Sequence, residues 1–265
     1  MDTTKTWGHY APNPKAWPLR TLIRIGLARG ALKKRLVHSW IKRFGPILDI
    51  ERSGIKYRLG LDDNVTDRRI LTSSKRYDRP EIKSLIAACK KDVFIDLGAN
   101  IGFYSLSLAS AGSNVLAIEP NPAALERLRY NTQLNSFADK IKVVPFGVGE
   151  SGEFQLSDKG DLGSASIQSS NATKSVTITT KPLLELLSEN NIKAIGGLKI
   201  DIEGMEDRAL RPFFESAPLS LWPKCIVIEH CCSDNWQEDI IAYMLNNGYR
   251  LQLKTRGNSV LKLKA

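Results

Sequence analysis

Short apolar runs recur along the chain from residue 92 onward, separated by segments in which apolar residues have helical spacing. Such runs are typical of buried strands, and their alternation with helices is typical of a parallel sheet covered on both faces. Strands are predicted at residues 92–97, 115–119, 141–148, 197–201 and 224–229, with a final hairpin at 249–253 and 259–263. Helices are predicted at residues 81–89, 102–111, 122–135, 182–190 and 236–247. The fold class expected is therefore α/β, with a doubly wound, mostly parallel sheet of seven strands.

One insertion interrupts this alternation. Residues 153–156 and 175–180 have the composition of strands and predict an added antiparallel pair. The Gly/Ser-rich run at 160–166 lies between them and is expected to be a loop.

The region before residue 80 has a different pattern. Apolar residues between Leu19 and Phe44 recur at helical spacing, with basic residues on the opposite face. Gly26 and Gly30 are expected to divide this amphipathic helix into two pieces.

A hairpin is expected after this helix, because residues 47–52 and 55–61 alternate on either side of a Ser-Gly turn. The polar run at 62–80 is either a cover over an active site or a plain surface connection. The expected domains are thus an N-terminal extension of basic helix and hairpin at 1–80, and a catalytic domain at 81–265.

Positive charge is concentrated at the N-terminus. The chain carries a net charge of +10, and residues 1–50 hold ten Lys or Arg against two Asp, which leaves +2 for the rest. Three roles for residues 15–44 are open: packing on the domain as a lid or dimer contact, peripheral contact with an anionic membrane, or nucleic-acid binding. Packing is favoured, and nucleic acid is not expected because no recognition module accompanies the charge.

The setting expected is reducing and cytoplasmic, with peripheral contact at the inner membrane face left open. The four cysteines have no metal-ligand spacing, and no metal site is expected. No apolar stretch reaches the length of a membrane span, so neither a span nor a signal peptide is expected.

Candidate chemistry begins where the first strand of the main sheet ends. The run at 93–97 carries Asp96, and Gly98 and Gly102 follow in the next turn. Twenty-one residues after Gly98, the next apolar run ends in Glu119, the usual place for an acid that binds ribose hydroxyls. This pair of features predicts a cofactor that contains a nucleoside.

The loop after Asp96 favours one cofactor over another. A dinucleotide site needs Gly-x-Gly-x-x-Gly, and a carboxylate at Asp96 would repel its pyrophosphate. S-adenosylmethionine carries a sulfonium and an ammonium, so an acid near it is favourable. The alternative interpretation is that Asp96 has only a structural role, as a cap for the next helix. The competing functions are a nicotinamide-dependent oxidoreductase and a non-catalytic, membrane-associated binding module.

Acids stand at the carboxyl ends of four expected strands: Asp96, Glu119, Asp201 and Glu229. Because parallel strands end at one edge of the sheet, these carboxylates are expected to meet. Buried carboxylates without a partner are costly, so such a cluster indicates a binding site. For Asp201 and the nearby Glu203, capping of the following helix is the other interpretation.

Three blocks of sequence resemble the FkbM-type methyltransferases, within the Rossmann-like class I S-adenosylmethionine-dependent superfamily. The blocks are residues 93–105, 117–122 and 198–206, and the third is the most specific to the family. The resemblance implies that Asp96, Gly98, Ala99, Asn100 and Gly102 surround the methionine part of the cofactor. It also implies that Glu119, with Pro120 beside it, holds the ribose, and that Gly147 and Val148 line the adenine pocket. Where the family often has Leu-Asp, this chain has Lys181-Pro182.

The resemblance further implies O-methylation of a hydroxyl on a sugar, a glycan or glycolipid, or a secondary metabolite. We hypothesise that Asp201 or His230 is the general base, and that Glu203 and Glu229 orient the substrate or the base. His230 as a hydrogen-bonded wall residue is the bland interpretation.

Overall fold

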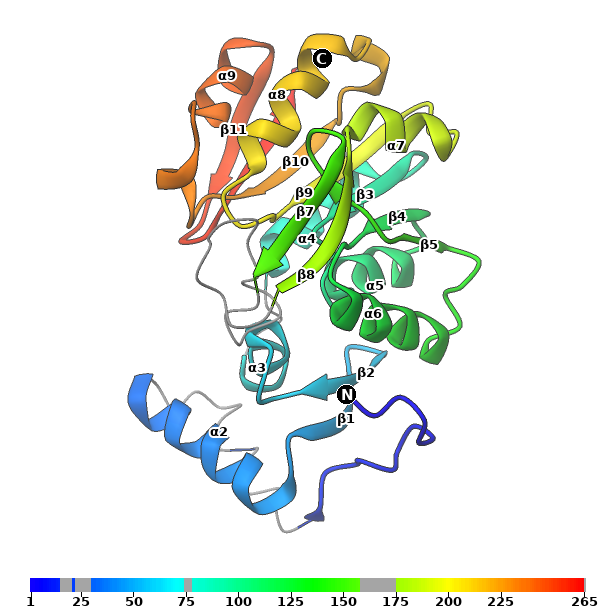
Figure 1. Ribbon diagram of the computed structural model, residues 1–265, viewed down its shortest axis with the longest axis vertical. Helices are drawn as coiled ribbons and strands as arrows, with labels where there is room; N and C mark the ends of the chain where they lie inside the picture. The colour runs from blue at the N-terminus through cyan, green and yellow to red at the C-terminus, as the bar shows by residue number, and fades with distance from the viewer. Residues whose placement is uncertain (15–20, 22–29, 74–77, 158–174, 265) are drawn as a thin grey trace.

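The computed structural model describes residues 1–14, 21, 30–73, 78–157 and 175–264 (Figure 1). Its main sheet contains β3 (Val93–Leu97), β4 (Val115–Ile118), β5 (Ile141–Val144), β9 (Ile195–Ile200), β10 (Cys225–Glu229), β11 (Tyr249–Lys254) and β12 (Asn258–Leu263). The order of these seven strands across the sheet is β11-β12-β10-β9-β3-β4-β5. Neighbouring strands from β5 to β10 pair in parallel, and β12 pairs antiparallel with β10 and β11. The predicted doubly wound, mostly parallel sheet is confirmed.

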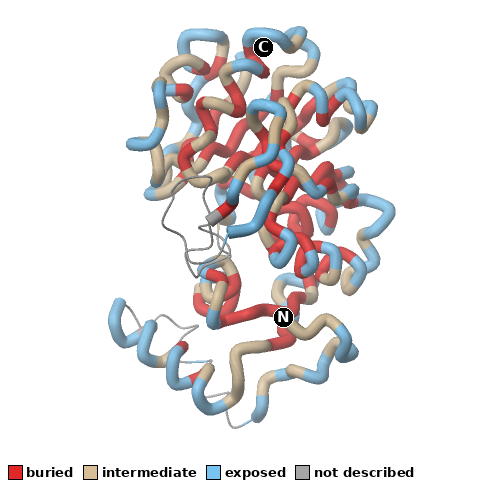
Figure 2. The backbone as a smooth tube through the Cα atoms, in the orientation of Figure 1, coloured by how far each residue is buried: buried red, intermediate tan, exposed pale blue. Residues whose placement is uncertain are grey.

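The buried residues lie mostly along the strands of the main sheet and the helices next to it (Figure 2). Successive residues of the strands point to opposite faces of the sheet, and each face carries its own core. Phe94 belongs to one core, whereas Ile95 and Leu97 belong to the other. The first face is covered by α4 (Arg79–Ala88), α5 (Phe103–Ser110) and α6 (Pro122–Leu134). The second is covered by α7 (Leu183–Glu189), α8 (Glu206–Ser216) and α9 (Ile240–Asn246).

The third predicted strand, 141–148, is divided in the structure. Residues 141–144 form β5, whereas β6 (Gly147–Val148) joins a separate three-stranded sheet with β7 (Gly152–Ser157) and β8 (Ser175–Lys181). Pro145 lies at the break, and it has no N–H to continue a ladder. β7 and β8 form the expected antiparallel pair. The Gly/Ser-rich run at 160–166 lies outside the described residues.

The extension contains α2 (Gly30–Phe44), the hairpin β1 (Ile47–Arg52) and β2 (Ile55–Gly60), and a helix α3 (Val65–Thr72) within the polar run. The hairpin turns at Ser53 and Gly54, both at positive φ. Trp40 of α2 and Tyr57 of β2 share one core with Phe94 of β3. The extension and the main sheet therefore share a core. The boundary at residue 80 stays a proposal, and it divides two regions of the sequence and not two separate cores.

Helix α2 packs through Val37 and Trp40, which are buried, while Lys34, Arg35, Lys42 and Arg43 are exposed. The expected apolar positions at 19, 22, 23 and 27, and the break at Gly26, lie outside the described residues. No helix in the described part of the chain has the length and apolar content needed to cross a bilayer.

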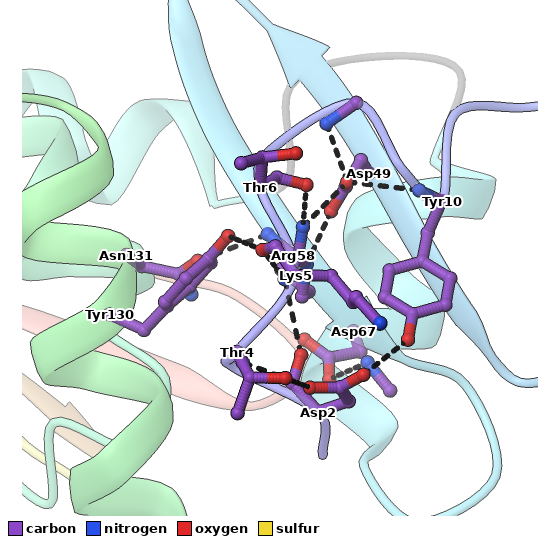
Figure 3. Close-up of polar contacts among 12 residues, drawn as sticks. Asp2, Thr4, Lys5, Thr6, Tyr10, Asp49, Arg58, Asp67, Tyr130 and Asn131 are labelled. Atoms are coloured by element: carbon purple, nitrogen blue, oxygen red, sulfur yellow. Dashed lines mark hydrogen bonds and ion pairs between the residues drawn. The ribbon is translucent and has the colours of Figure 1, made fainter.

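A buried ion pair fastens the first ten residues to the hairpin (Figure 3). The Arg58 guanidinium donates to Asp49 at 2.7 Å and lies between the rings of Tyr10 and Tyr130, at 5.0 and 4.7 Å from their centroids. The same guanidinium donates to the backbone carbonyls of residues 2, 5 and 6. Asp49 in turn accepts from the backbone N–H groups of residues 8 and 10. The N-terminal segment is thereby tied to β1 and β2.

Candidate active site

A hollow of about 290 Å³ lies beyond the carboxyl ends of the central strands, where the strand order reverses between β4, β3 and β9. This is the place where ligands bind in open α/β sheets. Ten of the predicted residues line it: Asp96, Gly98, Ala99, Asn100, Glu119, Pro120, Gly147, Val148, Asp201 and Glu203. Glu229 lines it as well, whereas Gly102 and His230 do not.

The loop after β3 needs glycine at Gly98 because it passes against the end of β9. A Cβ on Gly98, at φ 73°, would lie 2.0 Å from the carbonyl oxygen of Asp201. Gly102 has a different role, since a Cβ there would lie 2.5 Å from Leu128 of α6. It stands at the N-terminus of α5, at φ 93°, and lets that helix approach α6.

Asp96 is buried under the loop and serves two purposes. Its Oδ2 accepts from the backbone N–H of Ser105 at 3.0 Å and from the Ser105 hydroxyl at 2.6 Å. Asp96 thus caps the first turn of α5, as the alternative interpretation expects, but it also lines the hollow. Burial raises the pKa of Asp96 to about 6, against the hydrogen bonds from Ser105 and the charge of Lys199.

Glu119 is held between two backbone N–H groups. Its Oε2 accepts from Asn100 at 2.7 Å and its Oε1 from Asn121 at 2.8 Å, which fixes the carboxylate at the tip of β4. Burial raises its pKa to about 7. A carboxylate offers about four lone-pair directions, so two hydroxyls of a bound molecule can still donate to it.

The loop after β9 brings Asp201 and Glu203 to the hollow through residues at positive φ: Glu203 at 58° and Gly204 at 93°. Burial raises the pKa of Glu203 to about 7, and the charges of Asp201 and Glu229 add to the shift. Helix α8 begins at Glu206 without a side-chain cap, so neither Asp201 nor Glu203 caps it.

Glu206 holds this loop, a role that was not predicted from the sequence. Its Oε1 accepts from the N–H groups of Ile202 at 2.9 Å and Gly204 at 3.3 Å, and its Oε2 accepts from the indole N–H of Trp236 at 2.7 Å. The sequence did contain a signal for this role, because Glu206 stands two residues after Gly204 in an acidic turn.

Lys199 is a second residue of the site that was not predicted from the sequence. It is 3% exposed, lines the hollow and pairs with Asp201 at 3.2 Å, while its ammonium lies 5.5 Å from the Tyr104 ring centroid. A lysine inside the apolar run of β9 was the signal, because a buried cation needs a partner. The pair with Lys199 fixes the Asp201 carboxylate, which is 41% exposed.

His230 lies apart from the carboxylates, in a neighbouring hollow lined also by Trp236 and Lys254. Its Nδ1 is 3.2 Å from the Ser259 hydroxyl, and burial lowers its pKa. The adjacent Cys231 and Cys232 form no disulfide; Cys231 is exposed and Cys232 is partly buried. In the described part of the chain, no group of three His, Cys, Asp or Glu residues is arranged to hold a metal.

Helix α3 forms another wall of the main hollow, through Val65, Thr66 and Arg69. The polar run at 62–80 was expected to be either an active-site cover or a surface connection, and the position of residues 65–69 agrees with a cover. Asn64, just before this helix, donates from its side chain to the Asn100 side chain at 2.8 Å.

The hollow suits a positively charged ligand. Several acids line it, and the pKa values of Asp96, Glu119 and Glu203 are all raised, because burial disfavours their ionised forms by more than their hydrogen bonds and nearby cations offset. A sulfonium placed among them would stabilise these ionised forms, and a pyrophosphate would not.

Residues 96–251 match the methyltransferase FkbM domain, and these residues include every acid of the hollow. The chain belongs to the FkbM methyltransferase family. The family points to S-adenosylmethionine as the cofactor, in agreement with the charge of the hollow. The family also sets aside the nicotinamide-dependent alternative.

Similar proteins were found in sequence and in structure. Hexuronic acid methyltransferase AglP of Haloferax volcanii is 27% identical over 149 residues, which cover 51% of this chain and 56% of AglP. The chain thus aligns with about half the length of this relative.

Among solved structures, the M. jannaschii tRNA m1G37 methyltransferase has a TM-score of 0.45 at 13% identity, covering 83% of this chain and 57% of that one. The Pyrococcus abyssi tRNA (uracil-54, C5)-methyltransferase, in complex with S-adenosyl-L-homocysteine, has a TM-score of 0.46 at 13% identity, covering 82% and 44%. The fold assignment rests on the strand order of this chain and on its family.

Proposed function

We propose that this chain transfers the methyl group of S-adenosylmethionine to a hydroxyl oxygen of a sugar, a glycan or glycolipid, or a secondary metabolite. The observation that carries the proposal is the acid-lined hollow at the reversal of strand order, within the residues matched by the FkbM domain. When bound, the cofactor supplies a methyl group made electrophilic by its sulfonium.

The donor side is assigned as follows. Asp96, Gly98, Ala99 and Asn100 would surround the methionine part, with Gly102 shaping the loop from outside the hollow. Glu119 would accept hydrogen bonds from the ribose hydroxyls, with Pro120 beside it, and Gly147 and Val148 would line the adenine. Support comes from the fixed position of the Glu119 carboxylate between two backbone donors at the tip of β4.

On the acceptor side, we assign the general base to Asp201. The Asp201 carboxylate would accept the hydroxyl proton as the acceptor oxygen receives the methyl group, and the rest of the donor would leave as S-adenosylhomocysteine. Glu203 and Glu229 would orient the acceptor by accepting hydrogen bonds from its other hydroxyls. His230 has no part in this proposal, because it lies in the neighbouring hollow.

The acceptor class that we favour is an acidic sugar. The relative AglP is named as a hexuronic acid methyltransferase. Nucleic acid is not proposed as a partner.

The location proposed is the cytoplasm, with peripheral contact to the inner face of a membrane through residues 15–44. In the described part of this segment, α2 contains no acid and exposes Lys34, Arg35, Lys42 and Arg43. Sedimentation with phosphatidylserine vesicles tests this proposal. The full chain should sediment and a Lys34→Glu/Arg35→Glu variant should sediment less; equal partitioning of the two would contradict it.

The reaction is tested with methyl-labelled donor and a panel of uronate-containing and neutral oligosaccharides. We expect label in a uronate-containing product that is stable to mild alkali, because a methyl ether resists hydrolysis. Alkali-labile label would identify a carboxylate as the acceptor and overturn the hydroxyl assignment. Label only in neutral products would overturn the acidic-sugar assignment.

A further inference from the structure

One buried amide joins the N-terminal extension to the loop that holds the donor. Asn64 is 0% exposed. Its Oδ1 accepts from the N–H groups of Thr66 at 2.8 Å and Asp67 at 3.4 Å, which caps α3. Its Nδ2 donates to the Asn100 Oδ1 at 2.8 Å. A single side chain thus contacts both α3, which we call the cover helix, and the loop between β3 and α5 (residues 98–102), which we call the cofactor loop.

Asn100 is a constrained residue and passes this contact onward. It stands at φ 51°, in the left-handed region, and its N–H donates to Glu119 at 2.7 Å. Hydrogen bonds therefore connect Asn64, the cap of α3, through Asn100 to Glu119, the acid that we assign to the ribose. A shift of Asn64 would move both Asn100 and the carboxylate that this N–H helps to fix.

The extension itself is anchored firmly enough to act as a support. Asp67 of α3 accepts from the Gly60 N–H at 2.8 Å and pairs with Arg127 of α6 at 3.2 Å.

A second amide runs beside the first. Asn131 accepts from the Arg58 N–H at 3.0 Å and donates to the Ile101 carbonyl at 3.2 Å. The cofactor loop is thus held from outside at two successive residues, Asn100 and Ile101.

We propose that Asn64 is a positioning residue of the donor site, so that the extension completes a site whose other parts lie within the FkbM domain. Asn64 lies outside residues 96–251, which match that domain. This inference rests on the proposed function, because it requires the donor to occupy the hollow. Its consequence is that donor affinity depends on the hydrogen bond between Asn64 and Asn100, and not only on the stability of α3.

Two substitutions at Asn64 separate positioning from capping. Ser and Asp are both good N-caps, so both preserve the start of α3. Ser is too short to reach Asn100, whereas with Asp the Asn100 amide can turn and donate to the new carboxylate. Calorimetric titration with S-adenosylhomocysteine should give a Kd at least about tenfold weaker for Asn64→Ser, and within about threefold of wild type for Asn64→Asp.

The outcomes are distinguishable from one another. If wild type binds and both variants keep the wild-type Kd, Asn64 acts only as a cap and the inference is wrong. If wild type does not bind S-adenosylhomocysteine, the proposed function fails and this inference fails with it.

Hydrogen exchange on the wild-type full chain is a second test of the coupling, and it does not depend on a variant that folds. Saturating S-adenosylhomocysteine should slow exchange in residues 65–72 as well as in 98–102. Protection confined to 98–102 would contradict the coupling.

Discussion

The carbonyl oxygen of Asp201 lies 2.0 Å from the point where a Cβ on Gly98 would stand. The loop that would bind the donor and the residue assigned as general base are therefore in direct contact, through backbone atoms. No side chain larger than hydrogen fits between them without moving one of the two strand ends.

Gly98→Ala should damage both stability and donor binding. The left-handed backbone alone costs about 1 to 2 kcal/mol with a Cβ present, and the contact with Asp201 adds roughly 1 to 3 kcal/mol. Gly112→Ala is the matched control, because Gly112 also has positive φ, at 97°, but no atom within 4 Å of its Cβ position. Urea unfolding should show a clearly larger loss for Gly98→Ala; equal losses would refute the contact.

Donor affinity should rise with pH between about 5.5 and 7.5. The pKa values of Glu119 and Glu203 are raised to about 7, so both are largely protonated at pH 5.5 and ionise as pH rises. A sulfonium binds the ionised carboxylates better, and we expect roughly tenfold tighter binding at the upper end. Calorimetry in buffers of different ionisation enthalpy should also detect proton release. Affinity that is constant over this range would contradict the role of these acids.

The same pKa values predict the opposite trend for the stability of the ligand-free protein. The folded pKa of Glu119 lies above its ordinary 4.5, so between about pH 4.5 and 7 the folded state holds more protons than the unfolded state. Stability therefore falls as pH rises through this window. Thermal unfolding at several pH values should show the decline, and Glu119→Gln should reduce it.

Asp201→Asn should lower kcat by about 100-fold or more, which is the usual contribution of a general base. The change keeps the shape of the side chain, so the Kd for S-adenosylhomocysteine should change by less than tenfold. His230→Asn is the comparison variant, because His230 lies in the neighbouring hollow. A kcat that falls more for His230→Asn than for Asp201→Asn would reverse the assignment.

Glu206→Ala should destabilise the fold and slow transfer, since three donors would lose their acceptor: the Ile202 N–H, the Gly204 N–H and the Trp236 indole. We expect a loss of roughly 2 to 4 kcal/mol in urea unfolding. Trp236→Phe removes only the indole donor and should cost less than Glu206→Ala. Unchanged kcat in a folded Glu206→Ala protein would show that the loop does not need this support.

The sheet and its acids could be read from the sequence because they follow from local patterns. Runs such as 93–97 are apolar on both faces, so their strand character is visible without any partner. The meeting of Asp96, Glu119 and Asp201 at one edge then follows from parallel topology alone.

The remaining features depend on contacts between distant segments. His230 follows Glu229 directly, but neighbours in an extended segment point to opposite sides, and His230 lines the neighbouring hollow. Asn64 resembles any asparagine in a polar turn until α3 meets the cofactor loop. The division of the third strand is an exception, because Pro145 is visible in the sequence and proline interrupts a ladder.

The most direct test is a crystal structure of the full chain grown with S-adenosylhomocysteine. We predict that the ligand lies in the hollow against Gly98, with its ribose hydroxyls at hydrogen-bond distance from Glu119. A hollow that stays empty at saturating ligand, or a ligand bound elsewhere on the chain, would contradict the donor site on which the other assignments depend.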